Sequence, residues 1–164
     1  MPLPNLFIKE FYMSKIEHVK GDIFNLIGYD IVFAIDSTFS CDVGICKQIN
    51  DLYGVEKALK AIPFESSKWK GHGFCISFAK GIQNFHALVV KPLSQVYPEY
   101  KNIEEALMSL AANIKQKNNI ITPKIAMPKV CCGSYDKREW LLIEDIIKIA
   151  FAGIDCDILI VEKE

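Results

Sequence analysis

The sequence lacks a strong excess of charge of either sign, since its 164 residues hold 19 Lys and Arg against 20 Asp and Glu. Proteins that track along a nucleic-acid backbone need a strongly basic surface, so this class is disfavoured, although a single nucleotide remains a compatible ligand. No apolar run approaches the roughly 20 residues that a membrane helix requires. We therefore expect a protein without a membrane span.

Common phosphate and metal fingerprints are also missing. Neither GxxxxGK[ST] nor GxGxxG occurs, and the cysteines show neither C-x-x-C spacing nor a neighbouring His to complete a zinc set. No metal is therefore expected. Because the first residues do not form a signal peptide, we expect a cytoplasmic protein with six reduced thiols. These thiols are Cys41, Cys46, Cys75, Cys131, Cys132 and Cys156.

One of these cysteines could instead be a catalytic nucleophile with a His partner. The candidates for that partner are His18, His72 and His86. Small buried thiols are the commoner case, so packing in the core is the preferred interpretation.

The composition, with 51% hydrophobic and 24% charged residues, is that of an ordinary globular protein with one sizeable core. At this length we expect one domain, over residues 14–164. Residues 1–13 precede the first patterned segment and are expected to be an N-terminal extension, either flexible or not native to the protein.

Short apolar runs alternate with amphipathic helical patterns along the chain. Strands are expected at residues 16–19, 31–35, 74–79, 85–90, 124–130 and 157–161, with a hairpin joining the third and fourth. Helices are expected near 43–54, 55–62, 98–114 and 140–153. The run at 31–35 is continuously apolar, which is typical of a strand covered on both faces. This alternation predicts a layered α/β fold.

Ligands of open α/β sheets bind beyond the carboxyl ends of strands, so the loops that follow strands deserve inspection. Asp22 follows the first strand, where its carboxylate would accept hydrogen bonds from an exocyclic amine. A turn or helix cap is the common alternative for such an aspartate. The polar loop at residues 37–44 enters a helix whose free N–H groups would seat a phosphate, although a plain helix start has the same pattern.

A third loop, residues 131–136, lies between a strand and the last helix. Gly133 permits close approach of the backbone to an anion. Asp136 stands at the helix entrance, where Glu139 three residues later also fits a capping box.

Lys91 ends an apolar strand and precedes Pro92, which favours an extended backbone and places the lysine on the ligand side of the sheet. An amine must lose its proton to act as a nucleophile, and partial burial favours the neutral form. A solvated lysine at a strand end is the alternative.

Together these stretches resemble a macrodomain, the ADP-ribose-binding α/β fold. IEHVKGDIF (16–24) is similar to the family's first strand and its adenine-recognising aspartate. LVVK (88–91), PEYKNI (98–103) and MPKVCCGSYDKREW (127–140) resemble the terminal ADP-ribose protein glycohydrolase branch, also called ALC-like. The resemblance extends over nearly all of residues 16–161 and implies a three-layer α/β/α sandwich with a mixed central sheet.

The resemblance also implies site residues. In that branch a lysine attacks the anomeric carbon of the distal ribose, and an aspartate in the following glycine loop assists and resolves the covalent adduct. By position these are Lys91 and Asp136. Asp22 and Ile23 would contact the adenine. Backbone N–H groups of two loops would hold the pyrophosphate, with Ser37, Asp42, Val43, Gly44 and Ile45 in the first loop and Cys132, Gly133, Ser134 and Tyr135 in the second.

The chain departs from the family pattern at both loops. The first has Cys41-Asp42-Val43-Gly44 where a Gly-Ala-Gly-like pair is common, so it keeps one glycine and gains a carboxylate. The second is one residue longer before Asp136 than the family's Gly-x-Asp. Binding without turnover therefore stays open.

The implied protein is a monomeric ADP-ribosyl hydrolase without a cofactor. It would bind ADP-ribose and remove mono-ADP-ribose from a glutamate ester or a nucleobase through a lysyl-ADP-ribose intermediate. Its partners would be ADP-ribose and mono-ADP-ribosylated protein, or alternatively ADP-ribosylated nucleic acid, with no membrane. Alternatives are a non-catalytic ADP-ribose reader and a hydrolase of O-acetyl-ADP-ribose or ADP-ribose 1″-phosphate.

Overall fold

The computed structural model describes residues 14–62, 69–117, 120–133 and 136–163. Its strands are β1 (Lys15–Lys20), β2 (Asp30–Asp36), β3 (Phe74–Lys80), β4 (Gln83–Lys91), β5 (Lys124–Met127) and β6 (Asp157–Glu162). Its helices are η1 (Ile23–Asn25, a 3-10 turn), α2 (Gly44–Tyr53), α3 (Val55–Lys60), α4 (Tyr100–Gln116) and α5 (Trp140–Ala150). The extension expected at residues 1–13 lies outside the described residues.

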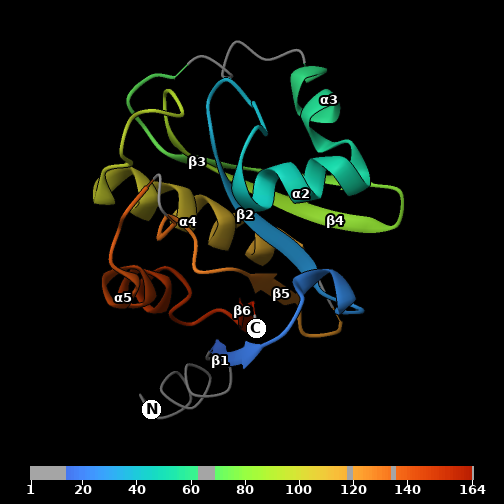
Figure 1. Ribbon diagram of the computed structural model, residues 1–164. Helices are drawn as coiled ribbons and strands as arrows, with labels where there is room; N and C mark the ends of the chain where they lie inside the picture. Colours follow the sequence, from blue (N-terminus) through green and yellow to red (C-terminus); the bar gives the residue numbers. More distant parts are fainter. Residues whose placement is uncertain (1–13, 63–68, 118–119, 134–135, 164) are drawn as a thin grey trace.

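The six strands form one sheet in the order β1-β6-β5-β2-β4-β3. β3 pairs antiparallel with β4, and the other pairs are parallel. The predicted hairpin is therefore confirmed, and its turn contains Gly81 at a φ of 63°. Because β1, β6, β5, β2 and β4 run parallel, their carboxyl ends lie at the same edge of the mixed sheet. Figure 1 labels the six strands.

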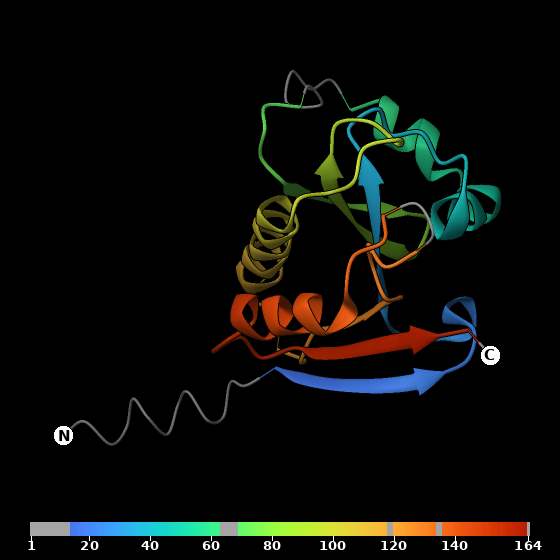
Figure 2. The same cartoon turned by 60° about the vertical axis from the view of Figure 1, so that its left-hand side comes forward.

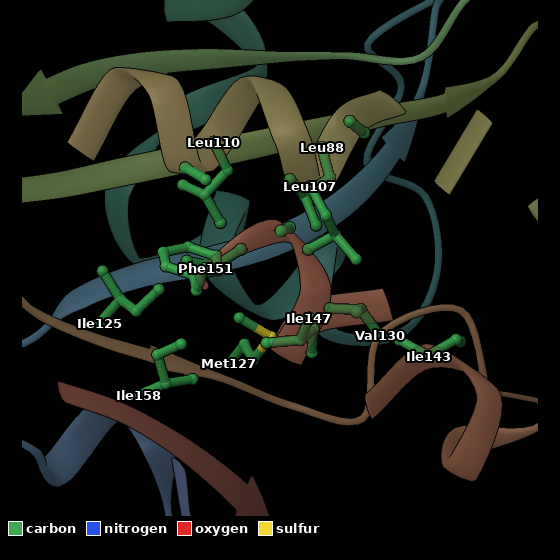
Figure 3. Close-up of a cluster of buried hydrophobic side chains, with 14 of the residues drawn as sticks. Leu88, Leu107, Leu110, Ile125, Met127, Val130, Ile143, Ile147, Phe151 and Ile158 are labelled. Carbon is green, nitrogen blue, oxygen red and sulfur yellow. The ribbon is translucent and has the colours of Figure 1, made fainter. Parts of the chain in front are cut away.

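Helices cover both faces of the sheet, so the three-layer α/β/α sandwich is confirmed (Figure 2). The α4 and α5 helices bury one cluster of apolar side chains against the sheet, including Leu107, Ile147 and Phe151 (Figure 3). The α2 and α3 helices bury a second cluster, which contains Ile49 and Leu59. No helix of the described residues is both long and apolar enough to traverse a bilayer.

Neighbouring residues of β2 show why its central run, residues 31–35, is apolar throughout. Val32 and Phe33 are both fully buried, yet they belong to the clusters on opposite faces of the sheet. This confirms the strand covered on both faces. The β5 strand, in contrast, ends at Met127 and not at Val130, because Pro128 has no N–H group with which to continue a ladder.

Candidate functional site

A cavity of about 430 Å³ opens at the carboxyl ends of β2, β4 and β5. Its volume is within the range of roughly 300 to 1,000 Å³ that is usual for small-molecule sites. The lining comes from the end of β2, the loop before α2, the end of β4 and the loop after β5. The lining residues are Ala34, Ile35, Asp36, Ser40, Asp42, Val43, Gly44, Ile45, Cys46, Lys91, Ser94, Gln95, Pro128, Lys129, Val130, Cys131, Gly133 and Asp136.

Lys91 is the last residue of β4, and its side chain is only 8% exposed. Its Nζ donates a hydrogen bond to the carbonyl oxygen of Ser94 at 3.0 Å and forms an ion pair with the carboxylate of Asp136. The alternative of a solvated strand-end lysine is therefore wrong. The buried ammonium lies in the cavity wall with one charged partner.

Asp136 is held in place by the backbone of its own loop. The N–H of Lys137 donates to the carbonyl of Gly133 at 2.9 Å, and the N–H of Arg138 donates to that of Cys131 at 2.9 Å. The alternative capping-box role is wrong, because the cap residue of α5 is Glu139, whose own side chain makes no capping hydrogen bond, and the Asp136 carboxylate pairs with Lys91 instead. A buried ammonium is the stronger partner for the Asp136 carboxylate than an exposed helix end.

A second carboxylate, Asp36, also lines the cavity, and sequence reasoning missed its role in the wall. Asp36 is 4% exposed and pairs with Lys91 in the register of β2 and β4. Its Oδ1 accepts hydrogen bonds from the backbone N–H of Thr38 at 2.8 Å and from the Thr38 hydroxyl. The available signal was its place at the end of an apolar strand, which is the same signal that singles out Lys91.

The N-terminus of α2 forms another part of the wall. The cap residue Val43 supplies no side-chain hydrogen bond, and Gly44 begins the helix at a φ of 62°. The first N–H groups of a helix have no partner within it, and they carry partial positive charge. Because this end lines the cavity, its N–H groups are positioned to bind an anionic group such as a pyrophosphate.

The loop at the entrance of α2 contains a disulfide between Cys41 and Cys46, whose Cα atoms are 4.9 Å apart. We call residues 41–46 the cystine loop. The expectation of six reduced thiols was wrong for this pair. The chain between the two cysteines contains Gly44, which has a positive φ of 62°, and the pair meets without C-x-x-C spacing.

The free cysteine in the cavity wall is poorly suited to nucleophilic chemistry. Burial raises the pKa of Cys131 well above 9.0, and the neighbouring charge of Asp136 raises it further. A thiolate, not a thiol, is the nucleophile, so this side chain is inert near neutral pH. The alternative of a catalytic cysteine therefore finds no support here.

The three histidines pair with groups outside the cavity lining. His18 pairs with Glu144, and His72 contacts Glu105 at 2.9 Å. His86 is fully buried between Ser77 and Asp30, at 2.7 and 2.9 Å. Among the described residues, no three His, Cys, Asp or Glu side chains gather in a set that could hold a metal ion.

The remaining candidate residues have other positions. Asp22 is exposed and caps η1, where its Oδ1 accepts the N–H of Phe24 at 3.0 Å; neither it nor Ile23 is among the residues that line the cavity. Ser37 joins the ends of two strands, since its N–H and hydroxyl donate to the carbonyls of Lys91 and Pro92, each at 2.9 Å.

The second predicted loop is only partly described. Cys132 is half-buried beside the cavity lining, while Gly133 belongs to that lining. Ser134 and Tyr135 lie outside the described residues.

No protein-family model matches the chain, and no curated protein matches its sequence. Solved structures do match. The macrodomain of Thermus aquaticus DarG has a TM-score of 0.76 at 16% identity, over 91% of this chain and 99% of that one. The macrodomain of Mycobacterium tuberculosis DarG has a TM-score of 0.73 at 18% identity, over 90% and 97%.

A third similar structure contains a ligand. Thermosipho africanus DarTG in complex with ADP-ribose has a TM-score of 0.68 at 18% identity. The match covers 90% of this chain but 41% of that chain. At identities this low, the likeness establishes the architecture and leaves the chemistry to the residues of this chain.

Proposed function

Because the chain has the macrodomain fold, we propose that its cavity binds ADP-ribose and that the protein is an ADP-ribosyl hydrolase. Its substrate is mono-ADP-ribose on an acidic side chain, with a nucleobase as the other carrier. The observation that carries this proposal is the buried Lys91–Asp136 pair in the wall of a cavity that is also lined by the N-terminus of α2, which has no side-chain cap. The resemblance to the ALC-like branch supports the same assignment.

The two walls suit the two halves of the ligand. A pyrophosphate carries negative charge and needs hydrogen-bond donors, which the first N–H groups of α2 supply. A carboxylate beside the pyrophosphate would repel it, so Asp36 and Asp136 suit the neutral distal ribose better. This division places the anomeric carbon next to Lys91.

The proposed reaction has two steps. Lys91 passes a proton to Asp136, and its neutral amine attacks the anomeric carbon while the bond from that carbon to the carried group breaks. Water then attacks the same carbon, breaks its bond to Nζ and passes one of its protons to that nitrogen, which restores the Lys91 ammonium. The proton that Asp136 took in the first step goes to a nucleobase leaving group or, when a glutamate carboxylate has left, to solvent, so Asp136 is again a carboxylate. Free ADP-ribose leaves, and each residue has recovered its starting charge.

The leaving group decides how much acid assistance is required. A glutamate carboxylate has a reference pKa of about 4.3 and departs without a proton at neutral pH. A nucleobase nitrogen departs poorly as an anion, so it needs the proton that Asp136 has taken from Lys91. The reaction is therefore less demanding with the acidic side chain.

A non-catalytic reader is the second candidate, and one observation favours it. The Lys91 Nζ is held by its ion pair with Asp136 and by its hydrogen bond to Ser94, so it is not free to attack carbon until these contacts are broken. A reader needs the cavity alone and leaves both contacts intact. The altered first loop, with Asp42 in place of a glycine, is compatible with either candidate.

The test measures release of ADP-ribose from a protein modified on glutamate. The wild type should release it, while Lys91→Met should bind ADP-ribose and release none. Lys80→Met is the matched control, since Lys80 also ends a strand but is exposed and outside the cavity lining. Undiminished release by Lys91→Met would contradict the proposed role, and tight binding without release by the wild type would establish the reader.

A further inference from the structure

The cystine loop is the part of the cavity wall for which the proposed reaction gives no role. Cys41 and Cys46 are both buried, at 4% and 7% exposed. Cys46 lines the cavity together with the residues enclosed by the disulfide, Asp42 to Ile45. The disulfide therefore closes a ring around the same backbone that presents the N-terminus of α2 to the ligand.

The disulfide is too local to be an important support for the whole domain. The two cysteines are five positions apart, and the stabilisation from a disulfide grows with the length of the loop that it closes. Its Cys41 end is also anchored independently, because the N–H of Cys41 donates to Glu56 at 3.0 Å. The N–H of Glu56 in turn donates to Asn50 of α2 at 2.9 Å. What the disulfide restricts is the conformation of the residues between its ends.

The other described cysteines have little tendency to undergo thiol exchange. Burial raises the pKa of Cys75 and of Cys156 to about 12, and burial also raises the pKa of Cys132. Exchange requires a thiolate, so these thiols react slowly near neutral pH. Cys46 differs, since it lies in the first turn of α2, where unpaired N–H groups stabilise negative charge on sulfur.

We propose that Cys41 and Cys46 form a thiol–disulfide exchange site that controls ligand affinity, with the disulfide form binding tightly and the dithiol form binding weakly. The identity of the ligand, ADP-ribose, rests on the proposed function. The co-reactant is a dithiol, either a small molecule or a redox protein with two thiols. Cytosolic disulfides, where they occur, are usually transient and redox-sensing, which is consistent with such a role.

The exchange is balanced in two steps. A thiolate of the dithiol attacks Sγ of Cys46, the bond to Cys41 breaks, and Cys41 leaves as a thiolate that takes up a proton. The second thiol of the co-reactant loses its proton and attacks the mixed disulfide. Cys46 then leaves as a thiolate, which also takes up a proton, and the co-reactant becomes a disulfide. Two electrons and two protons pass to the protein, and the reverse exchange restores the disulfide.

The direction of the effect follows from conformational freedom. In the dithiol form, the backbone of residues 42–45 is no longer confined by the ring, so a ligand must order it on binding. We expect roughly tenfold weaker binding of ADP-ribose by the dithiol form. Because linkage is reciprocal, saturating ADP-ribose should shift the dithiol–disulfide equilibrium toward the disulfide by the same factor.

The experiment measures these two factors separately on the full chain. Calorimetry gives the Kd of ADP-ribose for air-oxidised protein and for protein reduced with dithiothreitol. Alkylation and mass spectrometry count the free thiols in each form. The same count over a series of dithiothreitol redox buffers, with and without ADP-ribose, gives the shift in the equilibrium.

Two variants accompany the wild type. Cys41→Ser/Cys46→Ser cannot form the disulfide, so it should bind ADP-ribose as weakly as the reduced wild type, whatever the redox buffer. Cys75→Ser is the matched control, because Cys75 lies on β3 away from the cavity lining, and it should keep the full redox response.

The expected result is a larger Kd on reduction, with a shift of the dithiol–disulfide equilibrium by the same factor. The Kd of the double variant should not change with the redox buffer. Equal affinities of the oxidised and reduced wild type would overturn the proposal, as would six alkylated cysteines in the oxidised protein. An intact disulfide with no binding of ADP-ribose in either form would instead contradict the proposed function, and the redox control of that ligand with it.

Discussion

The ion pair between Lys91 and Asp136 allows a quantitative test of how strongly the cavity wall is desolvated. Three variants remove its charges singly and together: Lys91→Met, Asp136→Asn and the double variant. Methionine keeps the length of the lysine stem, and asparagine keeps the shape of the carboxylate. Each single variant leaves one charge of the pair without its partner, whereas the double variant leaves no charge.

The magnitudes follow from the exposure of the two side chains, which is 8% for Lys91 and 16% for Asp136. Removing one partner of a fully buried pair costs about 3 to 5 kcal/mol, because the other charge stays unpaired. Since Asp136 keeps some contact with solvent, we expect each single substitution to cost about 2 to 3 kcal/mol. In the double variant only the carbonyl of Ser94 loses its donor, at a cost of about 1 kcal/mol.

The measurement is urea unfolding followed by circular dichroism, with equal slopes required for all four proteins. The expected coupling free energy is at least about 3 kcal/mol, and the double variant should be more stable than either single variant. Single costs that simply add in the double variant would show a solvated pair and refute the reasoning. The double variant should also release no ADP-ribose, which would show that the pair is kept for chemistry and not for stability.

Three further variants test other parts of the structure. Gly73→Ala would place Cβ 1.8 Å from the carbonyl oxygen of Asn102, so thermal unfolding should show a loss of about 3 kcal/mol; an unchanged Tm would contradict this packing. Asp42→Asn removes a carboxylate from the cavity wall and should tighten ADP-ribose binding about threefold by calorimetry, less so at high salt. Partial burial raises the pKa of Asp30, but the hydrogen bond and charge of His86 outweigh it and hold that pKa below 3.8. The resulting stabilisation is fully present above pH 3.8 and is lost as the pH falls through the folded-state pKa. In acid unfolding, the difference in free energy of unfolding between wild type and Asp30→Asn should therefore decrease over that pH range.

The elements of the fold could be predicted because they depend on local periodicity. The apolar stripe that includes Leu107 and Leu110 identifies α4, and the continuous apolar run of β2 identifies a strand buried on both faces. One boundary could have been placed better, since Pro128 was visible in the sequence and ends β5. Local patterns were thus sufficient for the architecture.

The site was predictable only where a general rule of sheet topology applies. Lys91 and Asp136 are 45 positions apart, yet Lys91 ends β4 and Asp136 lies in the loop after β5, and the carboxyl ends of these parallel strands share one edge of the sheet. The rule did not distinguish a cap from a partner at Asp136, because the capping-box pattern is local and the competing ammonium is distant in sequence. The role of Asp36 could not be predicted for the same reason. Its hydrogen-bond partner Thr38 is only two residues away, but its burial depends on strands that are distant in sequence.

The disulfide illustrates a different limit. Two cysteines five positions apart can meet only if the chain between them turns, and Gly44, which lies between them, has a positive φ of 62°. A single glycine permits such a turn, but it does not specify that two cysteines on either side of it meet. The lack of a signal peptide led to the expectation of reduced thiols, whereas the structure joins Cys41 and Cys46 in a disulfide.

The nearly neutral charge of the chain is compatible with the proposed binding of an anionic ligand, because the proposed recognition uses backbone dipoles. The α2 N-terminus offers N–H groups, and Lys91, a cation of the lining, is already neutralised by Asp136. Binding through fixed dipoles involves little release of counterions, so the affinity for ADP-ribose should depend weakly on salt. A steep salt dependence would instead indicate that Lys129, the other lysine of the lining, contacts the pyrophosphate directly. The charge balance thus favours a protein that binds one nucleotide-sized ligand in a cavity over one that follows an extended polyanion.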